Sequence, residues 1–256
     1  MTTTDFNVMD GAQGQKQHFA ALVEDERFRW QTGNPYIVHK EKDLLRVLSS
    51  HDRRSRLLEV GCGEGANLAN LEGTFEKAVG VDFSWKRVAF CRKNVVGAQF
   101  GCGDAANLPF SDETFDVVFC RDLLHHVPDP SRVLMEMNRV CKPGGHLILI
   151  EANGKNPIIY LQGRIIKLER AVLRASAESY LGLLSKCMPA NVSLCMREPF
   201  PIFRMLLHHK FGFPRLARNR LVTWVLSFLD SIACMAMPKD RWAYILITAI
   251  RPEMSF

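Results

Sequence analysis

The sequence lacks the cysteine spacing of structural metal sites and of secreted disulfide scaffolds. It has eight cysteines, and none of them belongs to a CxxC pair. Isolated cysteines in apparent strands and helices are usually small, buried apolar residues. We therefore expect no bound metal and no structural disulfide from Cys62, Cys91, Cys102, Cys120, Cys141, Cys187, Cys195 and Cys234.

Targeting segments and long apolar runs are scarce as well. The N-terminus, MTTTDFNVMD, has neither the basic flank nor the apolar stretch of a secretory signal. Residues 221–237 are very apolar but fall short of the roughly 20 residues of a membrane span, and Thr223, Ser227 and Asp230 form a polar stripe along them. We expect a core or interface helix there, and a cytoplasmic protein that can also contact a membrane peripherally.

Low-complexity tracts and fixed-period repeats are absent from the 256 residues. Apolar residues make up 47% of the chain and charged residues 23%, as in average globular proteins. Disordered and fibrous classes are thereby excluded. A chain of this length has room for one large domain with elaborations.

Acidic residues are few in the C-terminal part, which carries a net charge of +9 over residues 152–256 against −3 over residues 1–151. Such a part favours an anionic partner. Three interpretations stay open: a lid for an apolar small molecule with a carboxylate or phosphate, a surface that rests on anionic lipid, and nucleic-acid binding. Nucleic acid is the least favoured partner, because apolar residues interleave with the basic residues in this part of the chain. Between Glu198 and Asp230 there is no acidic residue, and the basic residues are Arg204, Lys210, Arg215, Arg218 and Arg220.

Apolar runs rich in β-branched residues alternate with helical patterns. This alternation predicts right-handed βαβ units and an α/β fold with a doubly wound sheet. One further buried strand is expected over residues 241–250, after a helix near residues 203–209. The five runs are Arg56–Val60, Ala78–Val81, Ala98–Cys102, Phe115–Cys120 and His146–Ile150.

Capping signals place the helices. Ser84 is expected to cap a helix over residues 85–95, and Asp129 to cap another that begins at Pro130. The run KPGG, residues 142–145, predicts a helix stop and a tight turn. A helix over residues 156–175 would pack one face on the domain, with a membrane-surface helix as the alternative. That face contains Ile158, Leu161, Ile165, Leu168 and Val172.

The stretch LLEVGCGEGANL satisfies the GxGxxG/A fingerprint of nicotinamide-binding folds, with Gly61, Gly63 and Ala66 in its three places. Asp82 follows 21 residues after Gly61, where a carboxylate can accept hydrogen bonds from a ribose diol. These features indicate that a nucleoside binds, but they do not distinguish a dinucleotide from another nucleoside ligand. An NAD-dependent oxidoreductase is therefore an alternative at this point.

Two further acids follow strand ends. Glu59 lies inside the end of the first strand, where a carboxylate is costly unless it receives hydrogen bonds or meets a cationic ligand. Asp104 follows the third strand, and an acid beside a backbone amide there can bind the edge of adenine. The nucleoside interpretation is thereby strengthened.

Four blocks then resemble the successive motifs of the class I S-adenosylmethionine-dependent methyltransferases, in particular the small-molecule group called type 11. They are LLEVGCGEGANL, VGVDFS, GDAANLPFSDETFDVVFC and LHHVPDPSRVLMEMNRVCKPGGHLILIE, within about residues 55–152. The resemblance implies a Rossmann-like seven-stranded sheet with an antiparallel last strand. It also implies S-adenosyl-L-methionine as cofactor, S-adenosyl-L-homocysteine as product and EC 2.1.1 chemistry of the kind used in small-molecule or natural-product biosynthesis.

The resemblance also implies roles for residues. The first glycine loop would frame the methionyl part, Asp82 would hold the ribose and Phe83 would contact the adenine face. Phe83 could instead be a core residue, and Arg121 could point to solvent or bridge to Asp122. The implied cofactor-binding positions are Glu59, Gly61, Cys62, Gly63, Asp82, Phe83, Asp104, Ala105 and Arg121.

Methyl transfer needs alignment and a dry site, and a base only when the acceptor must lose a proton. His125 and His126 lie where the family places residues between cofactor and substrate, so either is a candidate base, His125 first. His125 is also a candidate substrate contact. Trp30 and Tyr36 could close over cofactor or substrate, or be ordinary packing aromatics.

The sequence thus predicts a methyltransferase that moves a methyl group by in-line displacement to a small, apolar acceptor that is anionic or lipid-like. A non-catalytic methyltransferase-like binding or scaffold protein is the alternative. Within one domain we expect a helical N-terminal cap, a cofactor-binding core, a mainly helical basic insertion on the substrate side, and a final strand with a tail. Their ranges are 1–50, 51–152, 153–240 and 241–256.

Overall fold

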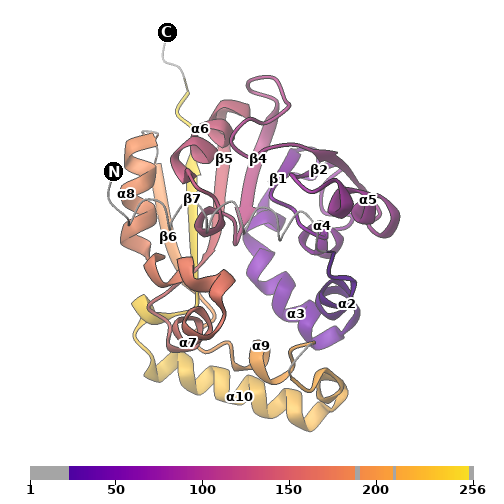
Figure 1. The fold of residues 1–256 in the computed structure, drawn as a ribbon, viewed down its shortest axis with the longest axis vertical. Coiled ribbons are helices and arrows are strands. Elements are labelled where there is room, and N and C mark those ends of the chain that lie inside the picture. Colours follow the sequence, from indigo (N-terminus) through magenta and orange to yellow (C-terminus); the bar gives the residue numbers. More distant parts are fainter. Residues whose placement is uncertain (1–22, 188–190, 210–211, 254–256) are drawn as a thin grey trace.

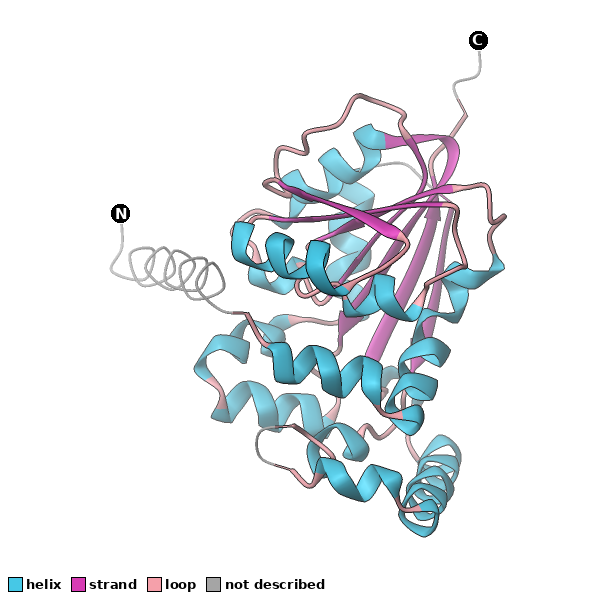
Figure 2. Ribbon diagram, turned by 90° about the vertical axis from the view of Figure 1, so that its right-hand side faces the viewer, coloured by secondary structure: helices cyan, strands magenta, loops and turns pink. Residues whose placement is uncertain are grey.

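A seven-stranded sheet with the order β3-β2-β1-β4-β5-β7-β6 forms the centre of the fold, with helices on both of its faces (Figures 1 and 2). The computed structural model describes residues 23–187, 191–209 and 212–253; the expectations for residues 1–22 and for Lys210 lie outside these ranges. The strands are β1 (Arg56–Val60), β2 (Lys77–Asp82), β3 (Ala98–Cys102), β4 (Phe115–Arg121), β5 (Cys141–Ala152), β6 (Asn191–Arg197) and β7 (Tyr244–Ile250).

Strands β1 to β5 run parallel, whereas β7 pairs antiparallel with both β5 and β6. The α/β class, the five predicted parallel strands and the antiparallel last strand are confirmed. No local pattern predicted β6, because this edge strand is largely exposed and lacks a buried apolar run. It lies within the insertion expected to be mainly helical.

The predicted caps of two helices are confirmed. The Ser84 side chain accepts from the N–H of Arg87, and the Asp129 side chain accepts from the N–H of Arg132. The α-helices are α2 (Asp25–Gly33), α3 (Pro35–Leu44), α4 (Ala66–Asn70), α5 (Trp85–Asn94), α6 (Pro130–Val140), α7 (Pro157–Ile165), α8 (Ala177–Cys187), α9 (Ile202–Leu206) and α10 (Arg220–Ala236). Short 3-10 helices span η1 (Leu45–Ser50), η2 (Leu124–His126), η3 (Lys167–Arg174), η4 (Pro214–Arg218) and η5 (Lys239–Arg241).

Three local expectations were wrong in part. The helix stop before residues 142–145 is confirmed, because α6 ends at Val140. The run itself belongs to β5 and forms no separate tight turn, and Gly144 supplies a positive φ of 70° within it. The helix expected over 156–175 is interrupted at Ile166, whose backbone is extended, and Leu161 and Ile165 are exposed. Of the two roles expected for the helix over 221–237, the core role is wrong, because Leu226 is its one fully buried described residue, and the interface role stays a prediction.

The C-terminal helices gather at the carboxyl edge of the sheet. Figure 1 shows α7, α9 and α10 beyond the ends of β4 and β5, with α10 as the outermost of the three. A second, small apolar cluster joins α3, α9 and α10 through Ile37, Phe203 and Leu226. In the part of the chain that the structure describes, no helix is both long and apolar enough to cross a membrane.

Candidate functional site

The loop after β1 is held against β2 by its own backbone. The N–H groups of Gly61 and Cys62 both donate to the carbonyl oxygen of Val81, at 2.8 and 3.0 Å. Gly61 has a φ of +74°, and a Cβ there would lie 2.8 Å from a methyl carbon of Leu123. The backbone conformation therefore favours glycine, and a side chain here would also have to displace that of Leu123. The Cys62 side chain is buried.

Glu59 is a buried carboxyl group with one oxygen left over. Its Oε1 accepts from Asn67 Nδ2 at 2.6 Å, while its Oε2 is buried with no hydrogen-bond partner among the described residues. Burial raises the pKa of Glu59 to about 8. A cationic group placed at Oε2 would stabilise the charged form, so this position fits a ligand with a positive charge.

Asp82, at the end of β2, is fixed by the two loops that flank it. Its Oδ2 accepts from the N–H of Gly63 at 3.0 Å and its Oδ1 from the N–H of Ser84 at 2.9 Å. Burial raises its pKa, while Arg87 at 4.0 Å and these two backbone bonds oppose the shift. The carboxylate is thus preset in orientation beside the glycine loop.

The predicted adenine-binding residues lie on the neighbouring strand ends. Phe83 is half-buried directly after β2. Asp104 is exposed after β3, where its Oδ1 accepts from the N–H of Ala106, and Ala105 is half-buried beside it. The carboxyl ends of β1, β2 and β3 therefore bring the predicted set to one edge of the sheet.

Arg121 is buried in a network of charges that the sequence did not predict. Its guanidinium donates to Glu41 of α3 and, at 2.9 Å, to Asn67 Oδ1, so it reaches Glu59 through one amide. The alternative ion pair with Asp122 is also present, with 3.6 Å between Arg121 Nε and Asp122 Oδ2. Arg204 donates to the other oxygen of Glu41 at 2.8 Å. Despite burial, the two arginines lower the pKa of Glu41 to about 2.

A histidine and a carboxylate form a buried pair after β4 and at the end of β5. His125 Nδ1 lies 2.9 Å from Glu151 Oε2, and Glu151 Oε1 accepts from the N–H groups of Leu123 and Leu124. Tyr180 of α8 donates to Glu151 Oε2 at 3.3 Å. Burial alone would lower the pKa of His125, but the bond to Glu151 and its charge raise it above its usual value.

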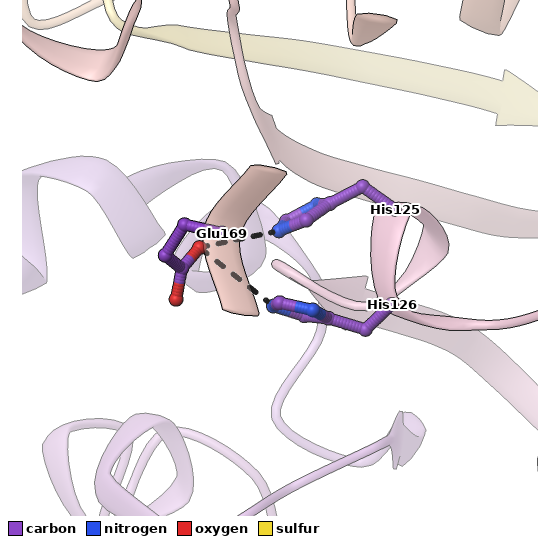
Figure 3. Close-up of side chains that lie close together, drawn as sticks. All are labelled: His125, His126 and Glu169. Atoms are coloured by element: carbon purple, nitrogen blue, oxygen red, sulfur yellow. Dashed lines mark ion pairs between the residues drawn. The ribbon is translucent and has the colours of Figure 1, made fainter. Parts of the chain in front are cut away.

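His126 and Glu169 complete the group around His125 (Figure 3). Glu169 Oε2 lies 4.0 Å from Nε2 of each histidine, and the His125 and His126 rings are 4.0 Å apart. Burial, then the charges of His125 and Arg27, lower the pKa of His126 well below its usual value. Nε2 of both histidines and a carboxylate oxygen thus converge, within the reach of one metal ion. The expectation of no metal stays a prediction.

Trp30 and Tyr36 are partly buried and pack against the second apolar cluster. Trp30 Nε1 donates to the carbonyl of Leu207 at 2.6 Å, and the Tyr36 ring packs edge-on against Phe203. These contacts are those of ordinary packing aromatics, which was the alternative role expected for both residues. Contact with a substrate stays a prediction.

Several site residues escaped the sequence analysis. Glu151 ends a buried strand as Glu59 does, so the same signal could have identified it. Glu41 and Arg204 gave no signal, because each is one charge in a helix whose burial depends on the tertiary fold. The missed residues are Glu41, Asn67, Glu151, Glu169, Tyr180 and Arg204.

Known proteins with a similar sequence are consistent with a nucleoside-binding site at the carboxyl edge of the sheet, where the glycine loop and the acidic residues lie. A family model described as a methyltransferase domain matches residues 58–149. This region is a class I, S-adenosylmethionine-dependent methyltransferase domain. The resemblance drawn from the four sequence blocks is thereby confirmed.

Two curated relatives share this methyltransferase domain. A phthiotriol/phenolphthiotriol dimycocerosates methyltransferase of Mycobacterium ulcerans is 41% identical over 107 residues, 40% of each chain. A phosphatidylethanolamine N-methyltransferase of Cereibacter sphaeroides is 35% identical over 130 residues, 47% of this chain and 63% of the relative. The chain therefore spans less than two thirds of the length of these relatives.

Solved structures share the fold of the methyltransferase domain and of most of the chain around it. A phosphoethanolamine N-methyltransferase of Haemonchus contortus, in complex with S-adenosyl-L-methionine, is 20% identical with a TM-score of 0.63, over 89% of this chain and 56% of that one. A methyltransferase of Thermotoga maritima is 20% identical with a TM-score of 0.61, over 87% and 93%. At this level of identity the likeness concerns the fold alone.

Proposed function

We propose that this chain transfers a methyl group from S-adenosylmethionine to a small, apolar acceptor that is anionic or lipid-like and that loses a proton in the reaction. The observation that carries the proposal is the pair formed by His125 and Glu151 at the same strand edge as Glu59 and Asp82. A proton acceptor and a nucleoside-binding edge in one place suit methylation of a hydroxyl group, which must lose its proton.

The cofactor supplies an electrophilic methyl group on a positively charged sulfur. Glu59 fits the cationic methionyl end, because its buried Oε2 has no hydrogen-bond partner among the described residues. Asp82 fits the ribose diol, since each of its oxygens already accepts one N–H and retains capacity for another donor. Phe83, Asp104 and Ala105 would hold the adenine.

Glu151 holds the Nδ1 side of His125, and we assign the acceptor proton to Nε2, which lies 4.0 Å from Glu169 Oε2. In the proposed step a bond forms between the acceptor oxygen and the methyl carbon as the sulfur–methyl bond breaks. The sulfur keeps that electron pair and becomes neutral, and the acceptor proton passes to Nε2 of His125. His126 is the second candidate for this role, favoured by its lowered pKa.

The nature of the acceptor is supported by the names of the relatives. They include the phthiotriol enzyme and the phosphatidylethanolamine enzyme above, and also a fatty-acid O-methyltransferase of Mycolicibacterium smegmatis, 38% identical over 107 residues. The basic, apolar insertion over residues 153–240 provides a matching surface. We propose that residues 51–152 bind the cofactor, that residues 1–50 and the insertion enclose the acceptor, and that the protein contacts anionic membrane.

Titration calorimetry with S-adenosylhomocysteine and with NADH tests the cofactor assignment. We expect binding of S-adenosylhomocysteine only; binding of NADH alone would favour the oxidoreductase alternative. Methyl-labelled S-adenosylmethionine with a lipid extract then tests the reaction. Binding without any labelled product, in lipid and water-soluble extracts alike, would leave the scaffold alternative.

A further inference from the structure

Helix α10 exposes a continuous apolar face to solvent. The Trp224 side chain is 63% exposed and that of Met235 is 90% exposed, and the Trp224 and Phe228 rings stack at 5.7 Å. The spacing of three and four residues keeps the whole set on one side of the helix. This apolar face consists of Leu221, Trp224, Val225, Phe228, Leu229, Ile232 and Met235.

The opposite side of α10 is attached to the domain. Leu226 is buried in the second apolar cluster, and Asp230 pairs with Lys40 of α3 at 2.7 Å. Asn219 caps the start of the helix by accepting from the N–H groups of Leu221 and Val222. The one acidic residue of α10 therefore faces inward and its apolar side faces outward, the reverse of an ordinary surface helix.

Basic residues flank this apolar face at both ends of α10. Arg215, Arg218 and Arg220 are exposed in η4 and at the start of α10, and Lys239 and Arg241 are exposed after its end. Asp240 is the single acid among them. Phe213 and Leu216 add exposed apolar side chains beside the first group. Apolar side chains framed by cations complement the interface of an anionic bilayer.

We propose that α10 lies in the plane of an anionic membrane, with its apolar face at the level of the acyl chains and the flanking arginines among the headgroups. A helix of 17 residues is about 26 Å long and does not span a bilayer. The inference rests on the proposed function in one respect. Since α10 lies on the side of the carboxyl edge of the sheet (Figure 1), docking would bring a lipid-like acceptor close to the site.

The test compares two matched double variants of the full chain. Trp224→Ser/Met235→Ser removes two members of the apolar face, and Trp85→Ser/Met135→Ser removes the same residue types from exposed positions on α5 and α6. Both are sedimented with phosphatidylcholine vesicles that contain or lack phosphatidylglycerol, at low and at high salt. Titration with S-adenosylhomocysteine and sedimentation velocity accompany each protein.

We expect the native chain and the α5/α6 variant to bind phosphatidylglycerol vesicles alike and to bind less at high salt. The α10 variant should bind about tenfold more weakly or worse. The proposal is overturned if the native chain does not bind, if both variants lose binding equally, or if α10 changes have no effect. It is also overturned if the native chain is a dimer that only the α10 variant dissociates. If the native chain does not bind S-adenosylhomocysteine, that result contradicts the proposed function and not the membrane proposal.

Discussion

His125 and Glu151 form a hydrogen bond of 2.9 Å between side chains that are both nearly inaccessible to solvent. Because Glu151 Oε1 is already bonded to two backbone N–H groups, the carboxylate is fixed and sets the orientation of the imidazole. The bond assigns Nδ1 to the carboxylate, and the proposed function assigns Nε2 to the acceptor. This arrangement leads to the first prediction.

Replacing His125 by alanine should reduce turnover by about 10²–10⁴-fold for an acceptor that must lose a proton. Binding of S-adenosylhomocysteine should change little, because His125 does not contact the glycine loop in the proposed arrangement. Single-turnover rates with labelled S-adenosylmethionine measure the first effect and calorimetry the second. Native turnover in this variant would exclude His125 as the base and leave His126 to be tested in the same way.

The pH profile of turnover should depend on Glu151. The carboxylate raises the pKa of His125, so the neutral, proton-accepting form appears only above the usual imidazole value of about 6.5. Turnover should therefore rise with pH through an inflection above that value. Glu151→Gln removes the charge and should move the inflection to lower pH while turnover falls. An unchanged inflection would show that another group titrates.

Cofactor binding should release a proton from Glu59. Its pKa of about 8 means that the group is largely protonated at pH 7, and a cation at Oε2 would favour its ionised form. The observed binding enthalpy at pH 7 should then differ between phosphate and Tris buffers. Glu59→Gln should abolish that difference, whereas Glu76→Gln at an exposed position should retain it. Equal enthalpies in both buffers for the native chain would contradict this role.

Gly61→Ala should weaken S-adenosylhomocysteine binding at least about tenfold, since the residue combines a φ of +74° with a contact of 2.8 Å to Leu123. Adding Leu123→Ala relieves the contact and leaves the backbone strain, so recovery should be partial. Calorimetry measures affinity, and circular dichroism checks that each variant is folded. Full recovery of the affinity would show that the contact with Leu123, and not the backbone conformation, makes a glycine necessary at position 61.

Acid should destabilise the fold partly through Glu41. Its pKa of about 2 in the folded state lies below that of an unfolded glutamate, so its stabilisation is complete above about pH 4.5 and is lost as the pH falls towards 2. The contribution is on the order of 3 kcal/mol. Urea unfolding at several pH values should show a shallower loss between pH 5 and pH 3 in Glu41→Gln, with lower stability at pH 7. Parallel profiles would refute the assignment.

The sequence identified the parts of the fold that follow local rules. Buried strands with β-branched runs, the caps at Ser84 and Asp129, and acids at strand ends such as Glu59 each depend on a few neighbouring residues. The exposed edge strand β6 and the break at Ile166 depend on what packs beside them, and no local pattern marks them.

The same difference separates the two halves of the site. Asp82 and Asp104 were found because nucleoside binding places acids at strand ends. Glu41 and Arg204 were missed because they meet across 163 positions of sequence, and a single charge in a helix is ordinarily solvated. The polar stripe of Thr223, Ser227 and Asp230 was visible in the sequence, but the direction of α10 depends on the contact between Asp230 and Lys40.

The chain of contacts from Glu198 through Arg204 and Glu41 to Arg121 ties the last part of the chain to the first and to the centre of the sheet. Exchange of segments between related proteins is constrained accordingly. A chimera that imports a new insertion with α9 but keeps the native α3 would bury Glu41 with one cation fewer. Transplanting acceptor preference therefore calls for moving α3 and α9 as one unit.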